Sequence, residues 1–332
     1  MNFIEIIKPD DWHVHFREGK LLKPLVQETS KIFNRSIVMP NLIHPIQTEK
    51  SALSYKEKIL KHVNNNPNFE PLITLYLSDD IDVREIEKAY KNLSVFAAKL
   101  YPAGATTNAS KGVKSFEKVY HIFEKMSELQ MPLLIHGEVN DKSVDVFYRE
   151  QIFIEDILEQ IITNFPELKI TLEHITTDFA VNYIKSQRSN VCASITPHHL
   201  ILNRSDMLEH KIKPHYYCLP ILKKEDDRKS LLDAATSGNN KFFLGTDSAP
   251  HTLDQKENEC GCAGIFNTIN SLQIVTQIFD DAKKLENLEK FVSINGPNHY
   301  NLKINTHKVK LHKKIKPIDF NDYLVIENVK LK

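Results

Sequence analysis

The chain is poor in cysteine, in net charge and in long apolar runs, and each absence excludes a class of protein. Four cysteines among 332 residues are too few for a disulfide framework. Lys plus Arg and Asp plus Glu both total 43, so no excess charge favours nucleic acid or an anionic membrane as a partner. No apolar run reaches the ~18 residues of a membrane span, and the N-terminus lacks the basic and apolar regions of a signal peptide. We therefore expect a cytoplasmic, reduced protein whose partner is a small molecule.

The chain also lacks a Pro-, Gly- or Ser-rich linker and an internal repeat. Hydrophobic residues make up 41% and charged residues 26%, an ordinary globular mixture that can bury a sizeable core. A length of 332 residues allows two average domains, but it also suits one α/β barrel, which takes ~250 residues before insertions. We predict a single domain over residues 1–332, in which residues from about 297 to 332 form a short C-terminal extension with a solvated, Lys-rich face.

Short apolar, β-branched runs alternate with longer amphipathic stretches along the chain. The runs predict eight strands, at Trp12–Phe16, Ser36–Met39, Leu72–Leu77, Val95–Leu100, Pro132–Ile135, Ile170–Leu172, Val191–Ile195 and Phe242–Leu244. The stretches between them predict helices such as Glu49–His62, Val83–Asn92, Ser115–Leu129, Val144–Asn164 and Glu225–Ser237, with Asp82 and Ser115 at N-cap positions. Eight strand–helix units in succession predict the α/β class, as a (β/α)8 TIM barrel.

The first predicted strand carries two histidines separated by one residue, His13 and His15. Strand side chains alternate between faces, so both imidazoles should leave the same side of the strand. Two parallel imidazoles form half of a site for a divalent metal. With 15 histidines in the chain, chance alone can produce such a pair, so the interpretation depends on the residues at the ends of the other strands.

The other strand ends supply further residues of the same chemistry. In a parallel barrel all loops that follow the strands open on one face, where catalytic groups collect. Six residues follow or end the predicted strands in this way: Arg17, Asn41, Lys99, His136, His174 and Asp247. A lone histidine after a strand is usually a packing or loop residue. Together with His13 and His15, however, these repeated positions predict a metal site.

Lys99 is unusual because it lies within an otherwise apolar strand. An ammonium is disfavoured there, and its pKa should fall. Two interpretations stay open. Lys99 forms a buried ion pair with a carboxylate, or its neutral amine takes up CO₂ and becomes a carbamate. A carbamate has two anionic oxygens that can bridge two cations, which would explain a lysine among metal ligands.

Several longer motifs, in this order, resemble the short bacterial dihydroorotases of the amidohydrolase superfamily. The resemblance covers the chain to about Gly296 and is weak beyond it. It rests on the segments at 9–15, 38–41, 98–102, 136–139, 173–177, 217–223 and 245–251. It implies reversible cyclisation of N-carbamoyl-L-aspartate to (S)-dihydroorotate plus water, a step of pyrimidine (UMP) biosynthesis.

The resemblance also implies a binuclear centre bridged by a hydroxide and a carboxylated lysine. Two divalent ions, with zinc the expected metal, would be held by His13, His15 and Asp247, by His136 and His174, and by carboxylated Lys99 between them. Asp247 would in addition be the catalytic group that carries the proton. All these positions are intact, and no substitution argues against the metal centre.

Resemblance further implies the residues that bind substrate and the state of assembly. Arg17, Asn41 and His251 would hold the substrate carboxylate, while backbone groups of Leu219 and Ala263 would contact the ring and His136 would also contact the substrate. Thr106 and Thr107 would lie on a mobile loop that closes over the pocket, although an ordinary polar loop has the same sequence character. The family resemblance suggests a homodimer.

Three alternatives to this function stay open. A cyclic-amide hydrolase of hydantoinase type would keep the metal centre but would not need a carboxylate clamp. A deaminase or phosphoesterase variant is less favoured, because deaminases of this barrel class manage with one metal and would leave Lys99 without a role. A catalytically inactive barrel kept as a structural subunit should have lost ligands. The roles of His198, His199 and the pair Cys260 and Cys262 are undetermined, with metal binding by the cysteines the less favoured interpretation.

Overall fold

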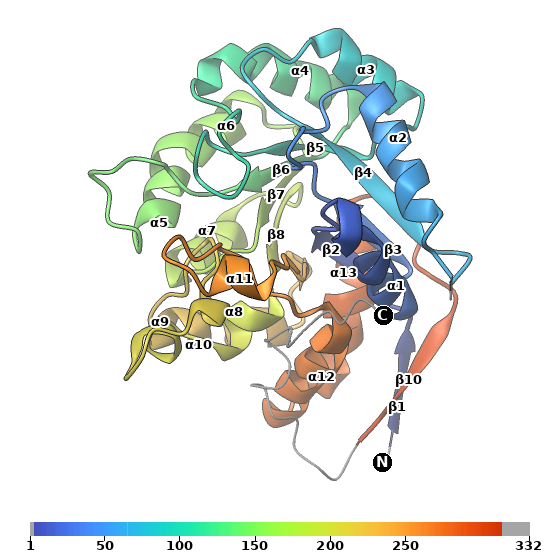
Figure 1. The fold of residues 1–332 in the computed structure, drawn as a ribbon, viewed down its shortest axis with the longest axis vertical. Helices are drawn as coiled ribbons and strands as arrows, with labels where there is room; N and C mark the ends of the chain where they lie inside the picture. The colour runs from blue at the N-terminus through green and yellow to red at the C-terminus, as the bar shows by residue number, and fades with distance from the viewer. Residues whose placement is uncertain (1–2, 65, 314–332) are drawn as a thin grey trace.

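The structure, a computed structural model, describes residues 3–64 and 66–313, and an eight-stranded parallel sheet forms its centre (Figure 1). The strands follow one another in chain order: β2 (Asp11–Val14), β3 (Arg35–Val38), β4 (Glu70–Tyr76), β5 (Ala97–Leu100), β6 (Leu133–His136), β7 (Ile170–Glu173), β8 (Val191–Ile195) and β9 (Phe242–Leu244). Parallel bridges from Ser248 to Val14 and Ile265 join the segment after β9 back to β2. The predicted barrel and its eight strands are confirmed, with ends that differ by a few residues.

Helices surround this sheet on its outer side (Figure 1). They are α1 (Leu22–Ile32), α2 (Glu49–Leu60), α3 (Val83–Lys91), α4 (Tyr120–Leu129), α5 (Arg149–Phe153), α6 (Glu159–Asn164), α7 (Asp178–Ser186), α8 (Pro197–Ile201), α9 (Arg204–Leu208), α10 (Glu225–Thr236), α11 (Leu253–Lys256), α12 (Ser271–Asp281) and α13 (Asn295–His299). Their buried residues join the outward-facing strand residues in one large apolar cluster. Burial of these amphipathic faces is what holds the helices to the barrel.

Two features of the predicted helix starts differ from the structure. Asp82 caps α3 as predicted, with its side chain accepting from the Arg84 N–H, but Ser115 bonds Glu117 and makes no cap bond. The predicted helix at 144–164 begins only at Arg149 and contains a π-helical segment, Ile154–Leu158. Residues 140–148 instead form turns, in which Asp141 and Asp145 accept backbone N–H groups.

α13 closes the N-terminal end of the barrel. Tyr300 follows this helix, lies 4.9 Å from Trp12 between ring centroids, and donates to or accepts from the Thr171 hydroxyl at 2.8 Å. Gly296 allows the close approach, since a Cβ there would lie 2.0 Å from the indole nitrogen of Trp12. This end is therefore filled by aromatic packing, and only the opposite end is open to a ligand.

A second, two-stranded sheet lies beside the barrel. β1 (Phe3–Ile7), which the sequence patterns did not predict, pairs antiparallel with β10 (Lys308–His312), and Figure 1 shows the two strands side by side. The exposed lysines of β10 agree with a solvated face. The predicted extension at 297–332 is described only to residue 313, so its remainder lies outside the described residues and the single domain over 1–332 stays a prediction.

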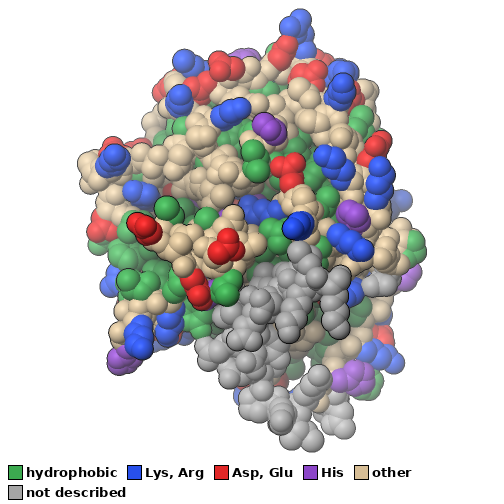
Figure 2. Space-filling model, in the orientation of Figure 1, with side chains coloured by type: hydrophobic (Ala, Val, Ile, Leu, Met, Phe, Trp, Pro, Cys, Tyr) green, Lys and Arg blue, Asp and Glu red, His purple; other side chains and the backbone are tan. Residues whose placement is uncertain are grey.

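Two observations bear on the expected partners. Within residues 3–64 and 66–313, no helix has both the length and the apolar composition needed to cross a membrane. The face in Figure 2 carries basic and acidic side chains together, as the balanced totals of 43 each predict.

Candidate metal centre

The predicted functional residues meet in a pocket at the carboxyl ends of the barrel strands. The lining includes His13, His15, Arg17, Asn41, Thr106, Thr107, His136, His174, Leu219, Asp247 and Ala263. Two predicted residues lie just beyond this lining: Lys99 is fully buried behind it, and His251 contacts Arg17. The structure thus brings together the residues that the sequence analysis assigned to metal and substrate binding, whereas His198, His199, Cys260 and Cys262 are not in this lining. Which of them bind metal or substrate stays a prediction.

His13, His15 and Asp247 form the first group of potential ligands. The Nε2 atoms of the two histidines lie 3.2 Å apart, and Asp247 Oδ1 lies 3.3 Å from His13 Nε2 and 3.2 Å from His15 Nε2. The alternation expected for a strand thus places both imidazoles on one side. Two imidazole nitrogens and a carboxylate oxygen that converge in this way form the kind of donor set that binds Zn²⁺.

His136 and His174 form the second group. His136 Nε2 donates to Glu138 Oε2 at 2.9 Å, which leaves His136 Nδ1 to face His174 Nε2 at 3.3 Å. A carboxylate that fixes the tautomer of an imidazole is a common feature of metal-binding histidines. His174 Nδ1 is buried without a partner among the described residues. The His13 and His174 rings lie 5.0 Å apart, so the two groups adjoin.

Lys99 lies beneath these groups, with no exposed surface. Its ammonium contacts Glu173, whose other oxygen lies 3.0 Å from His13 Nδ1. This contact is the arrangement expected for the ion-pair interpretation. Burial lowers the pKa of Lys99 well below its usual value, which favours the neutral amine that carboxylation needs. Carboxylation of Lys99 stays a prediction.

Three pocket residues other than glycine adopt left-handed backbone conformations. These residues are Arg17 with φ of 55°, and His174 and Asp247 with φ of 44° each. Such a conformation costs an L-residue roughly 1–2 kcal/mol and persists only where its surroundings compensate. The N–H of His174 donates to Ser194 Oγ, and the N–H of Asp247 donates to the His13 carbonyl, each at 2.9 Å. Three of the left-handed backbone positions in the described residues thus lie in the pocket lining.

Burial also sets the protonation of the imidazoles. It lowers the pKa of His15 to about 3, and it holds the pKa values of His13, His136 and His174 below their ordinary range. These rings are therefore neutral at pH 7 and have lone pairs available for a cation. Burial alone would raise the pKa of Asp247, but contacts with His13 and His15 hold it well below its usual value. The donor set is thus one carboxylate and neutral imidazoles, which fits divalent metal ions.

Polar groups capable of holding an anion stand beside the metal-type ligands. Arg17 Nη2 lies 3.2 Å from His251 Nε2, and Arg17 Nε donates to the Pro250 carbonyl at 3.2 Å. No ion pair links Arg17 to a carboxylate within the described part of the chain. His251 Nε2 also lies 2.9 Å from the Ala263 carbonyl, and burial lowers the pKa of His251 to about 4. A guanidinium held in this way can pair with a ligand carboxylate.

The predicted mobile loop lies against Asn41. Asn41 Nδ2 donates to the Thr107 carbonyl at 2.9 Å, and Asn108 Nδ2 donates to the Asn41 carbonyl at 3.0 Å. Asn41 Oδ1 is buried and has no partner among the described residues. One N–H of its amide remains for a ligand. Thr106 and Thr107 line the pocket, and movement of this loop stays a prediction.

Sequence reasoning missed three residues of the site. Glu173 and Glu138 orient histidines and Lys99, and Tyr101 lines the pocket with its ring 4.9 Å from the Lys99 ammonium. A signal was present, because Glu173 directly precedes His174 in an apolar strand and Glu138 follows His136 by two residues. A carboxylate at a buried position beside a histidine indicates a group that orients it.

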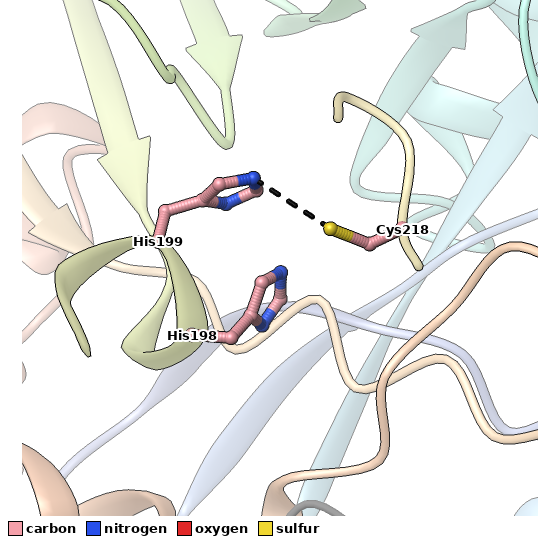
Figure 3. A group of neighbouring side chains, drawn as sticks. All are labelled: His198, His199 and Cys218. Carbon is pink, nitrogen blue, oxygen red and sulfur yellow. Dashed lines mark hydrogen bonds between the residues drawn. The ribbon is translucent and has the colours of Figure 1, made fainter. Parts of the chain in front are cut away.

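A further donor cluster lies outside the pocket lining, formed by His198, His199 and Cys218 (Figure 3). Each of the three side chains already makes a hydrogen bond. His199 Nε2 lies 3.0 Å from the Pro220 carbonyl, and the Cys218 thiol donates to the same carbonyl at 3.3 Å. His198 Nδ1 accepts from Asn267 Nδ2 at 3.0 Å. Hydrogen bonding therefore accounts for most of this cluster.

The fold and the site can be compared with known proteins. The amidohydrolase family matches residues 3–310. The sequence is 49% identical over 326 residues to the dihydroorotase of Acinetobacter baumannii, which covers 98% of this chain and 94% of that protein. The structure of a dihydroorotase from Campylobacter jejuni has a TM-score of 0.85 and 37% identity over 94% of this chain and 88% of that one. A dihydroorotase from Saccharomyces cerevisiae, in complex with 5-fluoroorotic acid, has a TM-score of 0.85 and 34% identity over 91% of this chain and 86% of that one.

The two groups of ligands can be tested by counting metal ions. We expect the intact protein, loaded with Zn²⁺ and desalted, to retain two ions per chain by elemental analysis, and His174→Ala to retain at most one, because an imidazole of the second group is removed. His210→Ala is the matched control, since the His210 side chain is 88% exposed. Equal metal contents in His174→Ala and His210→Ala would contradict a role for His174 as a ligand.

Proposed function

The chain belongs to the amidohydrolase family and, within it, to the dihydroorotases, and we propose that it catalyses the dihydroorotase reaction. In this reaction N-carbamoyl-L-aspartate cyclises reversibly to (S)-dihydroorotate plus water, a step of de novo pyrimidine biosynthesis. Enzymes of this group are hydrolases that act on cyclic amides. In the hydrolytic direction, water cleaves the ring amide between its carbonyl carbon and the adjacent ring nitrogen.

One observation carries the proposal: the pocket lined by the metal-type ligands is also lined by Arg17, which has no carboxylate partner among the described residues. Arg17 and His251 lie 3.2 Å apart beside the group that contains Asp247. Dihydroorotate has both features that such a pocket matches, a hydrolysable ring amide and a carboxylate. Hydantoins have the cyclic amide but lack the carboxylate. The pair of Arg17 and His251 therefore favours dihydroorotate over a hydantoin.

We assign two divalent metal ions, with zinc the expected metal, to the two groups of ligands. His13, His15 and Asp247 would hold one, and His136 and His174 the other. When bound, the ions would supply an activated water and polarise the amide carbonyl. Neutral, buried imidazoles and an ionised carboxylate support this assignment. Imidazole and carboxylate ligands also accept other divalent metals, so the donor set alone does not select zinc.

We further propose that Lys99 is carboxylated and bridges the two ions. A neutral amine adds CO₂ to form a carbamate and releases one proton, so a lowered pKa promotes the reaction. Lys99 is completely buried and its pKa is depressed by that burial. An ammonium at this position would also repel cations bound by His13 and His136, whereas a carbamate would attract them.

Asp247 is the group to which we assign proton transfer. Its Oδ1 lies within 3.3 Å of both His13 and His15 and faces the pocket. In the hydrolytic direction the carboxylate accepts a proton from the attacking water and then delivers it to the departing ring nitrogen. In the cyclisation direction the proton moves the opposite way. The ionised state of Asp247 suits it to begin hydrolysis as the base.

Binding of substrate is assigned to the other side of the pocket. The guanidinium of Arg17 would pair with the substrate carboxylate, with His251 and the remaining N–H of Asn41 as further donors. Backbone groups of Leu219 and Ala263 would contact the ring, and His136 would also contact substrate. Thr106 and Thr107 would close over it. Fixed positions for these groups would hold the ring amide near Asp247.

The proposal also includes a cytoplasmic homodimer. The four cysteines are free thiols, which agrees with a reducing compartment. The homodimer rests on the resemblance to the short bacterial dihydroorotases, and light scattering of the purified protein measures it directly.

Hydrolysis of L-dihydroorotate by the purified protein, before and after chelation, tests the function. We expect turnover that disappears when the metal is removed and returns with Zn²⁺, with metal content measured alongside. Hydantoin is the comparison substrate, and we expect little turnover of it. Turnover of hydantoin but not of dihydroorotate would contradict the proposed substrate and assign the protein to the hydantoinase type. Bound metal without turnover of either substrate would favour an inactive barrel.

Substitution of Lys99 distinguishes the carbamate from an ion pair with Glu173. We expect Lys99→Ala to lose at least one metal ion and most of the activity, and short carboxylic acids such as acetate to restore part of both. Lys118→Ala, at an exposed position, is the control. If Lys99 only neutralises Glu173, an added carboxylate will not restore activity. Full activity and full metal content in Lys99→Ala would contradict both interpretations.

Substitution of Asp247 tests the assigned proton transfer. We expect Asp247→Asn to keep the fold, measured by circular dichroism, and to lower kcat by a factor on the order of 10²–10⁴, since an amide cannot carry the proton. Metal content is measured in the same samples to separate this loss from loss of a ligand. Asp254→Asn, at an exposed site on α11, should leave kcat unchanged. A kcat near that of the intact protein at neutral pH would remove Asp247 from this role.

A further inference from the structure

Lys256 is a buried lysine to which the proposed chemistry assigns no role. It ends α11, and only 4% of its surface is exposed. Its Nζ donates to the carbonyl oxygens of Tyr217 at 2.9 Å, Cys262 at 2.7 Å and Gly264 at 2.9 Å. The three N–H groups of an ammonium are thus all matched. No ion pair joins Lys256 to a carboxylate in residues 3–64 and 66–313, so backbone carbonyls alone compensate its charge.

These carbonyls belong to two loops that form one wall of the pocket. Tyr217 lies two residues before Leu219 in the segment between α9 and α10, while Cys262 and Gly264 flank Ala263 in the segment between α11 and α12. The Gly264 N–H also donates to the Tyr217 carbonyl at 2.9 Å. Leu219, Ala263 and Gly264 all line the pocket. Lys256 therefore joins the two segments whose backbone faces a ligand.

The cluster in Figure 3 anchors the other end of the first loop. His199 and Cys218 both direct their donors to the carbonyl of Pro220, at 3.0 Å and 3.3 Å. The Thr196 hydroxyl lies 2.8 Å from His199 Nδ1, which fixes the ring from its other side. Leu219 is thus enclosed between Tyr217, held by Lys256, and Pro220, held by the cluster. The loop has little freedom to move, and its backbone is presented in one conformation.

We propose that Lys256 is a positioning residue that sets the spacing of the backbone groups of Leu219 and Ala263 for recognition of a cyclic ureide ring. This inference rests on the proposed function. The edge of such a ring alternates N–H and C=O groups, which backbone groups of opposite type can match. Matching requires the two loops to stay at a fixed separation, because an error of about 1 Å in donor–acceptor distance costs most of a hydrogen bond. The ammonium supplies this separation by binding carbonyls of both loops at once.

Lys256→Met tests the proposal. It keeps the length and apolar stem of the side chain and removes the three donors. We expect KM for L-dihydroorotate and the inhibition constant of orotate, a planar ring analogue, each to rise ~10-fold. We expect kcat to change less than threefold and metal content not to change. Lys229→Met, at an exposed position on α10, is the matched control and should leave every parameter as it was.

The outcomes separate this inference from the proposed function. An intact protein that does not turn over dihydroorotate contradicts the proposed function, whatever Lys256 does. An active intact protein whose KM is unchanged in Lys256→Met contradicts the positioning role. A parallel loss of kcat and metal with unchanged KM also contradicts it, since that pattern would mean general damage to the pocket. If Lys256→Met does not fold, Lys256→Gln, which keeps two N–H donors, replaces it with the same expected direction and a smaller rise.

The pH dependence of KM gives a second test that needs no change at Lys256. Burial lowers the pKa of Lys256 to about 8. Below that pH the ammonium donates three hydrogen bonds. Above it, the neutral amine turns a lone pair toward one carbonyl, so KM for dihydroorotate should rise between pH 7 and pH 9.5. The same rise should be absent from Lys256→Met.

Other titratable groups face Lys256 and must be separated from it. Burial raises the pKa of the Cys218 thiol and lowers the pKa values of His198 and His251 to about 4, so these groups keep their charge between pH 7 and pH 9.5. Cys262→Ser removes the remaining nearby thiol. The rise in KM should persist in Cys262→Ser, and a flat profile in that variant would contradict the role of the ammonium.

Discussion

Exclusion of water from the carboxyl ends of the strands is the constraint on which the rest of the site depends. It keeps the imidazoles of His13, His136 and His174 neutral, so their lone pairs are free for cations. The same residues on an exposed surface would be partly protonated near their usual pKa of about 6.5. The barrel excludes water from this region because eight strands end together while helices cover their outer side. The availability of these imidazoles as metal ligands thus follows from the packing of the barrel.

Buried polar groups at the carboxyl ends of the strands need hydrogen-bonding partners within the protein, and carboxylates supply several of them. Glu138 accepts from His136, and Asp11 accepts from both the N–H and the hydroxyl of Thr246. Burial raises the pKa of Asp11 to about 7, which shows how costly an isolated charge is there. Backbone hydrogen bonds likewise hold His174 and Asp247 in left-handed conformations that isolated residues avoid. Rigidity of the site is a product of these local contacts.

Much of the fold could be predicted because its signals are local. The eight apolar runs gave the barrel strands, and alternation along the first gave the shared direction of His13 and His15. β1 could not be found in this way, since it is half-exposed and its partner β10 lies some 300 residues later. The helix expected from residue 144 begins at Arg149, because aspartates before it satisfy the backbone as turns. Local patterns do not encode such distant or competing partners.

In the candidate site, too, some features can be recognised from the sequence and others cannot. Metal-type ligands are visible in a sequence because the chemistry belongs to particular side chains, such as those of His13 and Asp247. Recognition by backbone groups is invisible, because every residue carries the same N–H and C=O. Its geometry depends on what holds the loops, and Lys256 links the segments that contain Leu219 and Ala263 through the carbonyls of residues 217, 262 and 264. Under the proposed function, the reaction chemistry would belong to side chains at the strand ends, whereas the loops joined by Lys256 would determine which ring is accepted.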